Sequence, residues 1–92
     1  IQPVSEEASV TDVLNKVVTG EADAGLVYVT DVIGAGDDVH GIAFPESDAA
    51  VNVYPIAALT GGENADLAQE FLDLVTGEAG QSVLADAGFA RP

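Results

Sequence analysis

The sequence has 92 residues, of which 16 are acidic and 2 are basic, and its formal net charge is −14 at pH 7. Two cations cannot build the basic patch that a nucleic-acid backbone or an anionic membrane requires, so such partners are excluded. Cysteine is absent, which removes disulfides and thiolate metal sites, and no apolar run reaches the roughly 18 residues needed to span a bilayer.

The first residues predict a short strand followed by a helix. Ile1–Val4 is a strand candidate, and Val10–Thr19 is predicted to be an amphipathic helix because its apolar residues follow one another at helical spacing. Ser9 offers an N-cap, and Asp12 stands where a capping-box acid belongs. Gly20 is placed to end the helix in a left-handed conformation.

The next segment predicts a buried strand. Ala24–Val29 is short, β-branched and apolar on both faces, as a central parallel strand would be, so strand, helix and strand suggest a βαβ unit with a right-handed crossover. Thr30 and Asp31 are expected to cap a short helical turn that runs through Ile33. The glycines and aspartates of residues 34–38 predict a turn.

Two further strand candidates occupy the middle of the chain. Val39–Phe44 is closed by Pro45, and Glu46–Ala50 is a polar link to the apolar run Val51–Leu59. Pro55 lies inside that run, and a proline in a strand favours an edge, a bulge or a first position.

Two helices are predicted at the end of the chain. Asn64 can cap the first helix, Gly77 separates it from the second, Gly88 is a C-terminal cap signal and Phe89 can fold back onto the last turn. The apolar positions of the two helices are Leu67, Ala68, Phe71, Leu72 and Val75, and then Ala79, Val83, Leu84 and Ala87. The alternation of strands and helices predicts the α/β class.

Catalytic and metal-binding groups are poorly represented. The single histidine, His40, is expected to be a surface or edge residue, because a general base needs a matched partner within hydrogen-bond reach. Neighbouring Asp37 and Asp38 fit a turn better than a calcium loop, and no serine lies in a nucleophile elbow. Gly34–Gly36 lacks the lysine and the full glycine pattern of a phosphate loop. We therefore expect no enzyme, no metal site and no cofactor.

The stretch Ser9–Asp31 carries the candidate site. A helix that starts at Val10 has unpaired amide donors at the positive end of its dipole, and Tyr28 presents a hydroxyl where a strand ends. Ligands of open α/β sheets bind at such strand ends, so Val10 and Tyr28 could face one small anion together. The structural alternative is that Val10 is only a core residue and Tyr28 only a half-buried aromatic.

Three segments together resemble the periplasmic molybdate-binding proteins of ABC transporters, which are type II substrate-binding proteins. They are SVTDVLNKVVTGEADAGLVYVTD at Ser9–Asp31, VNVYPIAAL at Val51–Leu59 and AQEFLDLVTGEAGQSVLADAGF at Ala68–Phe89. The element G-E-A-D-A-G-[IL]-V-Y-x-[ST]-D is the specific signal. The resemblance covers nearly the whole chain but only the C-terminal part of the family's length. Because the first residue is Ile1 and no signal peptide is present, we expect a processed or truncated chain.

The resemblance implies a C-terminal portion of a two-lobed type II periplasmic-binding-protein fold, with a βαβ unit, a crossing strand and two C-terminal helices. Residues 1–50 would belong to the second lobe and carry half of the anion site. Residues 51–92 would supply the strand that crosses the hinge and the helices that pack on the first lobe. In the family, a backbone amide and a tyrosine hydroxyl at the positions of Val10 and Tyr28 bind an oxyanion oxygen. The other ligands would come from the N-terminal part of the same protein.

The function that the resemblance implies is the extracytoplasmic binding component of a molybdate or tungstate importer, in the periplasm or attached to the cell surface, with ABC permease subunits as partners. The scarcity of arginine agrees with a site of neutral donors, because arginine is the usual bidentate grip for carboxylate and phosphate. Two alternatives stay open: an oxyanion-sensing effector domain of a transcription regulator with the same fold, and a fragment that binds nothing and associates with itself. The sequence does not separate molybdate, tungstate and sulfate.

Overall fold

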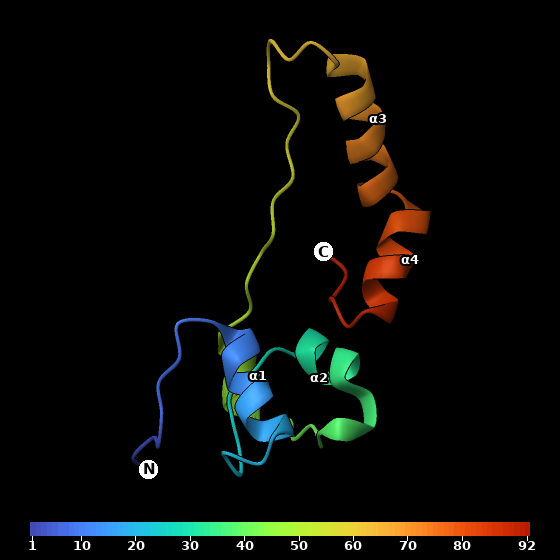
Figure 1. The fold of residues 1–92 in the computed structure, drawn as a ribbon. Coiled ribbons are helices and arrows are strands. Elements are labelled where there is room, and N and C mark those ends of the chain that lie inside the picture. Colours follow the sequence, from blue (N-terminus) through green and yellow to red (C-terminus); the bar gives the residue numbers. More distant parts are fainter. The chain divides into compact units, whose positions relative to one another are not determined.

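The computed structural model describes all 92 residues, and they form two compact units, Ile1–Ile42 and Ala43–Pro92. The chain forms four α-helices joined by loops and short 3₁₀ turns (Figure 1). Their bounds are α1 Val10–Val18, α2 Val29–Ala35, α3 Ala65–Thr76 and α4 Glu78–Asp86, with 3₁₀ turns η1 Gly36–Asp38 and η2 Pro45–Ala49. None of the helices combines the length and the apolar character that crossing a bilayer requires.

Helix α1 confirms the first predicted helix to within one residue at its end. The Ser9 hydroxyl accepts a hydrogen bond from the Asp12 N–H at 3.3 Å, which satisfies one of the open amides of the first turn. At the other end the Thr19 N–H donates to the Asn15 carbonyl at 2.9 Å. Gly20 follows with φ 77°, a left-handed conformation that costs glycine little and other residues more.

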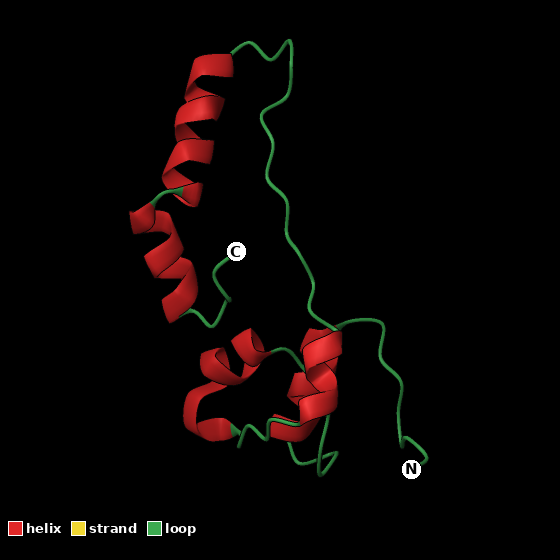
Figure 2. Ribbon diagram, turned by 180° about the vertical axis from the view of Figure 1, so that it is seen from behind, coloured by secondary structure: helices red, strands yellow, loops and turns green.

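The structure does not confirm the strand predictions, Ala24–Val29 among them. Ile1–Val4, Ala24–Tyr28, Val39–Phe44 and Val51–Leu59 are loops, so the βαβ unit is not formed, and Figure 2 shows helices and loops only. The backbone is nevertheless extended at Tyr28, with φ −79° and ψ 158°, and at Phe44, with φ −139° and ψ 140°. A strand exists only by hydrogen bonding to another strand. The 92 residues supply no such pairing, and the apolar runs therefore stay as unpaired segments.

Helix α2 begins where the sequence predicted the last residue of a strand, at Val29. The Asp31 carboxylate accepts a hydrogen bond from the Tyr28 N–H at 2.9 Å, and the Asp31 N–H donates to the Tyr28 carbonyl at 3.1 Å. These local bonds start a helix without any contact from a distant segment. Tyr28 is therefore the N-cap of α2, and the helix extends to Ala35, two residues beyond the predicted Ile33.

The segment before α2 lies against α1 although it forms no ladder with it. A Cβ atom added at Gly25 would lie 2.6 Å from Val13 Cγ1 and 3.2 Å from Val17 Cγ2. The backbone at Gly25 thus rests directly on the apolar stripe of α1, where any larger residue would push the two apart. In Figure 1 the loop that follows α1 runs back to the start of α2.

The polar connections adopt short 3₁₀ turns. The turn predicted over residues 34–38 is confirmed in its second half by η1, whereas Gly34 belongs to α2. The polar link predicted at Glu46–Ala50 is η2, which starts one residue earlier with Pro45 in its first turn. Proline fits there because its fixed φ suits a helical start and its missing N–H would have no partner in any case.

Helices α3 and α4 confirm the two predicted C-terminal helices. Asn64 occupies the N-cap of α3, although its side chain makes no capping bond, and Gly77 separates the two helices. After α4, Gly88 has φ 100° and the Phe89 N–H donates to the Leu84 carbonyl at 3.0 Å, so the backbone folds back as predicted. The Phe89 ring meets Tyr54 edge to face, with ring centroids 5.9 Å apart.

The junction of α3 and α4 is closely packed at Gly80. A Cβ atom at this position would lie 2.6 Å from the Val75 carbonyl oxygen and would also collide with the Leu74 carbonyl oxygen. The first turn of α4 therefore sits directly on the backbone of the last turn of α3. Only a residue without a side chain permits this approach.

No residue of the chain is fully buried. The surface measures 7700 Å², whereas a compact monomer of 9.3 kDa would expose about 5,000 Å² by the usual scaling. Large apolar side chains are exposed on α3 and α4 as well as in the loops, and Val53 is 85% exposed. The predicted apolar faces are therefore present, but within these residues they have no complete core to cover them.

Candidate anion site

The first of the two predicted site residues, Val10, is the first residue of α1. Its neighbours Asp12 and Val13 donate their N–H groups to Ser9, at 3.2 Å and 3.4 Å to the carbonyl oxygen. The amides of Val10 and Thr11 precede these and have no acceptor within the helix, because the first turn cannot supply one. The start of α1 thus carries two open donors together with the positive end of a nine-residue helix dipole.

The second predicted residue, Tyr28, is the N-cap of α2 and is 48% exposed. Its own N–H is occupied by Asp31, so the backbone of Tyr28 is fixed and the hydroxyl is the group left for another partner. A phenol hydroxyl can donate one hydrogen bond to an anion without carrying charge. Tyr28 therefore stands at the start of a helix instead of at the end of a strand.

Val10 and Tyr28 belong to the same compact unit, Ile1–Ile42. The contact of Gly25 with Val13 places the chain on α1 three residues before Tyr28. The two donors are therefore carried by neighbouring pieces of one unit. Their convergence on a single ion stays a prediction.

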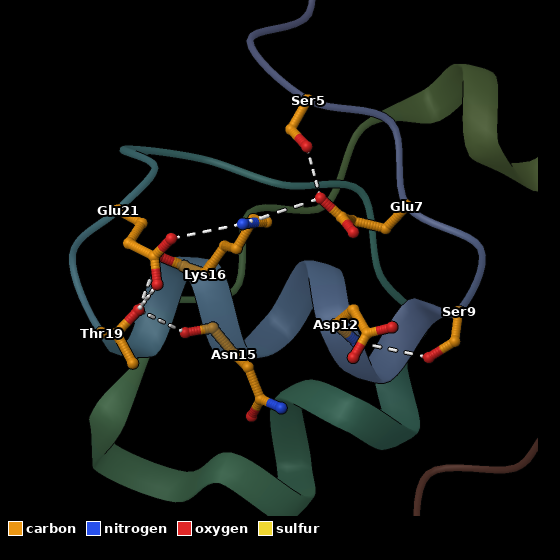
Figure 3. Close-up of polar contacts among 8 residues, drawn as sticks. All are labelled: Ser5, Glu7, Ser9, Asp12, Asn15, Lys16, Thr19 and Glu21. Carbon is orange, nitrogen blue, oxygen red and sulfur yellow. Dashed lines mark hydrogen bonds and ion pairs between the residues drawn. The ribbon is translucent and has the colours of Figure 1, made fainter.

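Both basic side chains are already paired with carboxylates. Lys16 Nζ lies 3.2 Å from Glu21 Oε2 and 3.8 Å from Glu7 Oε1, as Figure 3 shows. Arg91 makes a forked contact with Glu78, the shortest distance being 3.2 Å. The candidate site consequently depends on uncharged donors.

The contacts of Lys16 with Glu21 and Glu7 shift the pKa values of Lys16 and Glu21. The hydrogen bond to Glu21, followed by the charges of Glu21 and Glu7, raises the pKa of Lys16 above its ordinary value of 10.5. The hydrogen bond from Lys16, supported by one from Thr19, lowers the pKa of Glu21 below its ordinary value of 4.5. Both shifts favour the charged forms at neutral pH, so the ion pair persists there.

Sequence reasoning expected Thr30 and Asp31 to cap the helical turn, whereas the N-cap is Tyr28, and it missed the bond by which Asp31 fixes the backbone of Tyr28. The spacing of three residues between Tyr28 and Asp31 is that of a capping box and could have revealed this bond. The pairing of Lys16 with Glu7, nine positions away, has no local sequence signal, because it depends on how the chain enters α1.

The other candidate residues of the sequence are exposed. His40 is exposed, as predicted, and Asp37 and Asp38 lie in the 3₁₀ turn η1. A groove between α3 and α4 is apolar, and its wall holds no polar side chain that could face an anion. Its lining residues are Leu74, Val75, Ala79, Gly80, Val83 and Leu84.

Comparison with known proteins identifies relatives of the whole chain. The family model of the bacterial extracellular solute-binding proteins matches residues 2–90. The molybdate-binding protein ModA of Mycobacterium bovis is 52% identical over 92 residues, and two Mycobacterium tuberculosis strains have proteins of the same name with the same identity. All of this chain is covered, but it spans only 35% of the length of these curated relatives. No solved structure matches the chain.

Proposed function

Because the chain belongs to the family of bacterial extracellular solute-binding proteins, we propose that it is the C-terminal part of the molybdate-binding subunit of an ABC importer. The observation that carries the proposal is the identity of 52%, without a break in coverage, to proteins named for molybdate binding. Tungstate is the second expected ligand, since it is also a tetrahedral dianion. The protein would act outside the cytoplasm and deliver the ion to permease subunits.

In the whole protein the extended segments become strands. The backbone of Ala24–Tyr28 already rests on α1 at Gly25, and this segment would complete a βαβ unit of a type II fold once a strand from the rest of the protein pairs with it. Val51–Leu59 would cross between the lobes, and α3 and α4 would pack on the first lobe. The limited coverage of the relatives and the complete lack of buried residues support this reading.

The anion is held by uncharged donors. The Val10 N–H at the start of α1 and the Tyr28 hydroxyl each donate to an oxyanion oxygen, and donors from the N-terminal part of the protein complete the shell. Fixed dipoles in a cleft that excludes water hold an anion better than the same groups do in water. They also leave the empty site without a buried unpaired charge, which would be costly.

A shell of donors also selects the ligand. Molybdate at neutral pH is fully deprotonated and needs no acceptor from the protein, whereas protonated phosphate must place its hydrogen on an acceptor. A site without acceptors therefore rejects phosphate. Contacts from both lobes to one ion would stabilise a closed form of the protein, and this closed form would be presented to the permease.

Isothermal titration calorimetry of the full-length protein tests the proposal. Sodium molybdate and sodium tungstate are expected to bind at one site, and sodium phosphate at pH 7 is expected to give no binding heat. A protein that is folded by circular dichroism but does not bind molybdate would refute the proposed function. Binding of phosphate as tight as that of molybdate would refute the shell of donors alone.

A further inference from the structure

The ammonium group of Lys16 lies between two carboxylates that flank α1 in the sequence. Glu7 precedes the helix and Glu21 follows it, at 3.8 Å and 3.2 Å from Lys16 Nζ. Figure 3 shows the lysine reaching between the two acids. One side chain in the helix thus connects the segment that enters α1 with the loop that leaves it.

The entering segment is anchored at Glu7. Among the residues that precede α1, Glu7 is the one that is half-buried, with its side chain 22% exposed. The Ser5 hydroxyl also donates a hydrogen bond to the Glu7 carboxylate. The chain therefore approaches Ser9 and Val10 from a position that is fixed two residues earlier.

The leaving loop holds the other side of the lysine. Thr19 Oγ1 donates to the Asn15 carbonyl at 2.9 Å and contacts Glu21 Oε1 at 3.2 Å, while Lys16 Nζ donates to Glu21 Oε2. Helical side chains tilt toward the N-terminus of their helix, so Lys16 points back along α1 toward its start. A continuous set of polar contacts therefore runs from Thr19 through Glu21 and Lys16 to Glu7.

We propose that Lys16 is a positioning residue for the anion site, an inference that rests on the proposed function. Through its ion pair with Glu7, Lys16 fixes the path by which the chain enters α1 and keeps the Val10 amide open toward the ion. Lys16 itself does not touch the ion. Its pairing with two carboxylates keeps it from acting as a free counter-charge.

Preorganisation is the physical reason why the path matters. Ser9 has φ −136° and ψ 143°, and this extended conformation directs the chain away from the open end of the helix. An entering segment without its anchor samples other paths, some of which cover the Val10 amide. Binding must then include the loss of that freedom, and the affinity falls.

The decisive experiment compares Glu7→Ala with Glu6→Ala in the full-length protein, by calorimetric titration with sodium molybdate. Both variants remove one negative charge from neighbouring positions, but the exposed Glu6 makes no ion pair. If only net charge mattered, each variant would bind the dianion as tightly as the unmodified protein or more tightly. The positioning role predicts the opposite sign for Glu7→Ala, whose dissociation constant should rise about twofold to fivefold, as is typical for one ion pair near the surface.

The lysine provides the second arm. Lys16→Met should weaken molybdate binding to a similar degree, and Lys16→Arg, which keeps the cation, should restore most of the affinity. Should Glu7→Ala fail to fold, Glu7→Gln and Glu6→Gln, which keep the side-chain size and remove the charge, take the place of the two alanine variants. Glu7→Ala binding as tightly as Glu6→Ala, or Lys16→Arg binding as weakly as Lys16→Met, would overturn the inference and leave the proposed function intact. Absence of molybdate binding by the unmodified protein would overturn both.

Discussion

At the scale of single residues, the chain supplies donors for an anion but no charge to match it. Both of its basic side chains are held by carboxylates, whereas the start of α1 keeps open amides and Tyr28 keeps its hydroxyl. Such groups can hold a dianion through their dipoles, and they leave no isolated charge in the empty site. The two candidate positions were reached from the sequence because a capped helix start and a following tyrosine are local features.

The geometry around Tyr28 was less accessible to sequence reasoning. An apolar, β-branched stretch ends at Tyr28, and this pattern predicts a strand end. The Asp31 carboxylate instead starts a helix at the next residue by accepting the Tyr28 N–H. The tyrosine keeps the predicted place in the chain but acquires a fixed backbone that the hydrophobic pattern does not reveal.

Replacement of Tyr28 by phenylalanine tests the hydroxyl. The substitution removes one hydrogen bond to a charged ligand and leaves the ring in place, so molybdate affinity of the full-length protein should fall by about 1 to 2 kcal/mol. Calorimetric titration measures the loss, and Tyr54→Phe, which removes the hydroxyl of the other tyrosine, serves as the control. An unchanged dissociation constant for Tyr28→Phe would remove this residue from the site.

Two substitutions at Val10 separate its backbone from its side chain. Val10→Ala should leave molybdate affinity nearly unchanged, while Val10→Pro should abolish binding because proline lacks the N–H. The proline variant is expected to fold, because Val10 is the first helical residue and the extended Ser9 is already in the conformation preferred before proline. Calorimetry gives the affinity and circular dichroism the helix content. Full binding by a folded Val10→Pro protein would contradict the role of the helix start.

At the scale of elements, helices were predictable and strands were not. The predicted helix starts at Val10, after Asn64 and after Gly77 all agree with the structure, because spacing, caps and glycine stops act within a few residues. The strand candidates are equally clear as patterns, but none of them is paired. Strand formation depends on a partner segment, and pattern alone cannot supply one.

The ion pair at the end of α1 predicts a pH dependence of stability. The pKa of Glu21 is lowered, so its contribution is present above the ordinary value of 4.5 and is lost as the pH falls through the lowered value. The pKa of Lys16 is raised, so its contribution is present below 10.5 and is lost as the pH rises through the raised value. Glu21 is exposed and Lys16 is only partly covered, so the effect should be small.

Thermal unfolding of the full-length protein and its Lys16→Met variant, followed by circular dichroism, measures this dependence. The difference in Tm between the two proteins should be constant between about pH 5 and pH 10 and should shrink at either extreme. A difference that does not vary with pH from 3 to 11 would show that the lysine acts through its packing and not through its charge.

At the scale of the whole molecule, the exposed apolar surface is the main feature. All residues are at least partly exposed, and the apolar groove between α3 and α4 is open. Patches of this kind usually mark a surface that another segment covers. The chain spans 35% of the length of its curated relatives, and under the proposed function the remainder of the protein would cover this surface. The sequence predicted which faces are apolar, but it could not show that they would lack a partner.

This surface predicts the behaviour of the 92 residues when they are produced alone. They should bind molybdate at least a hundredfold more weakly than the full-length protein, because half of the donors are missing, and they should associate with one another through their apolar faces. Calorimetry measures the first property and sedimentation velocity the second. Tight molybdate binding by a monomeric 92-residue chain would show that the other segments are dispensable.

The close contact at Gly80 has a consequence for how this chain tolerates change. Apolar side chains on the outer faces of α3 and α4 can be exchanged for others of similar size, because loosely packed neighbours can adjust to them. Gly80 cannot be replaced in this way, because even the methyl group of alanine would clash with the carbonyl oxygens of Leu74 and Val75. A single alanine there would act as a wedge and tilt the last helix away from the one before it. The absence of a side chain at position 80 therefore fixes the angle between α3 and α4.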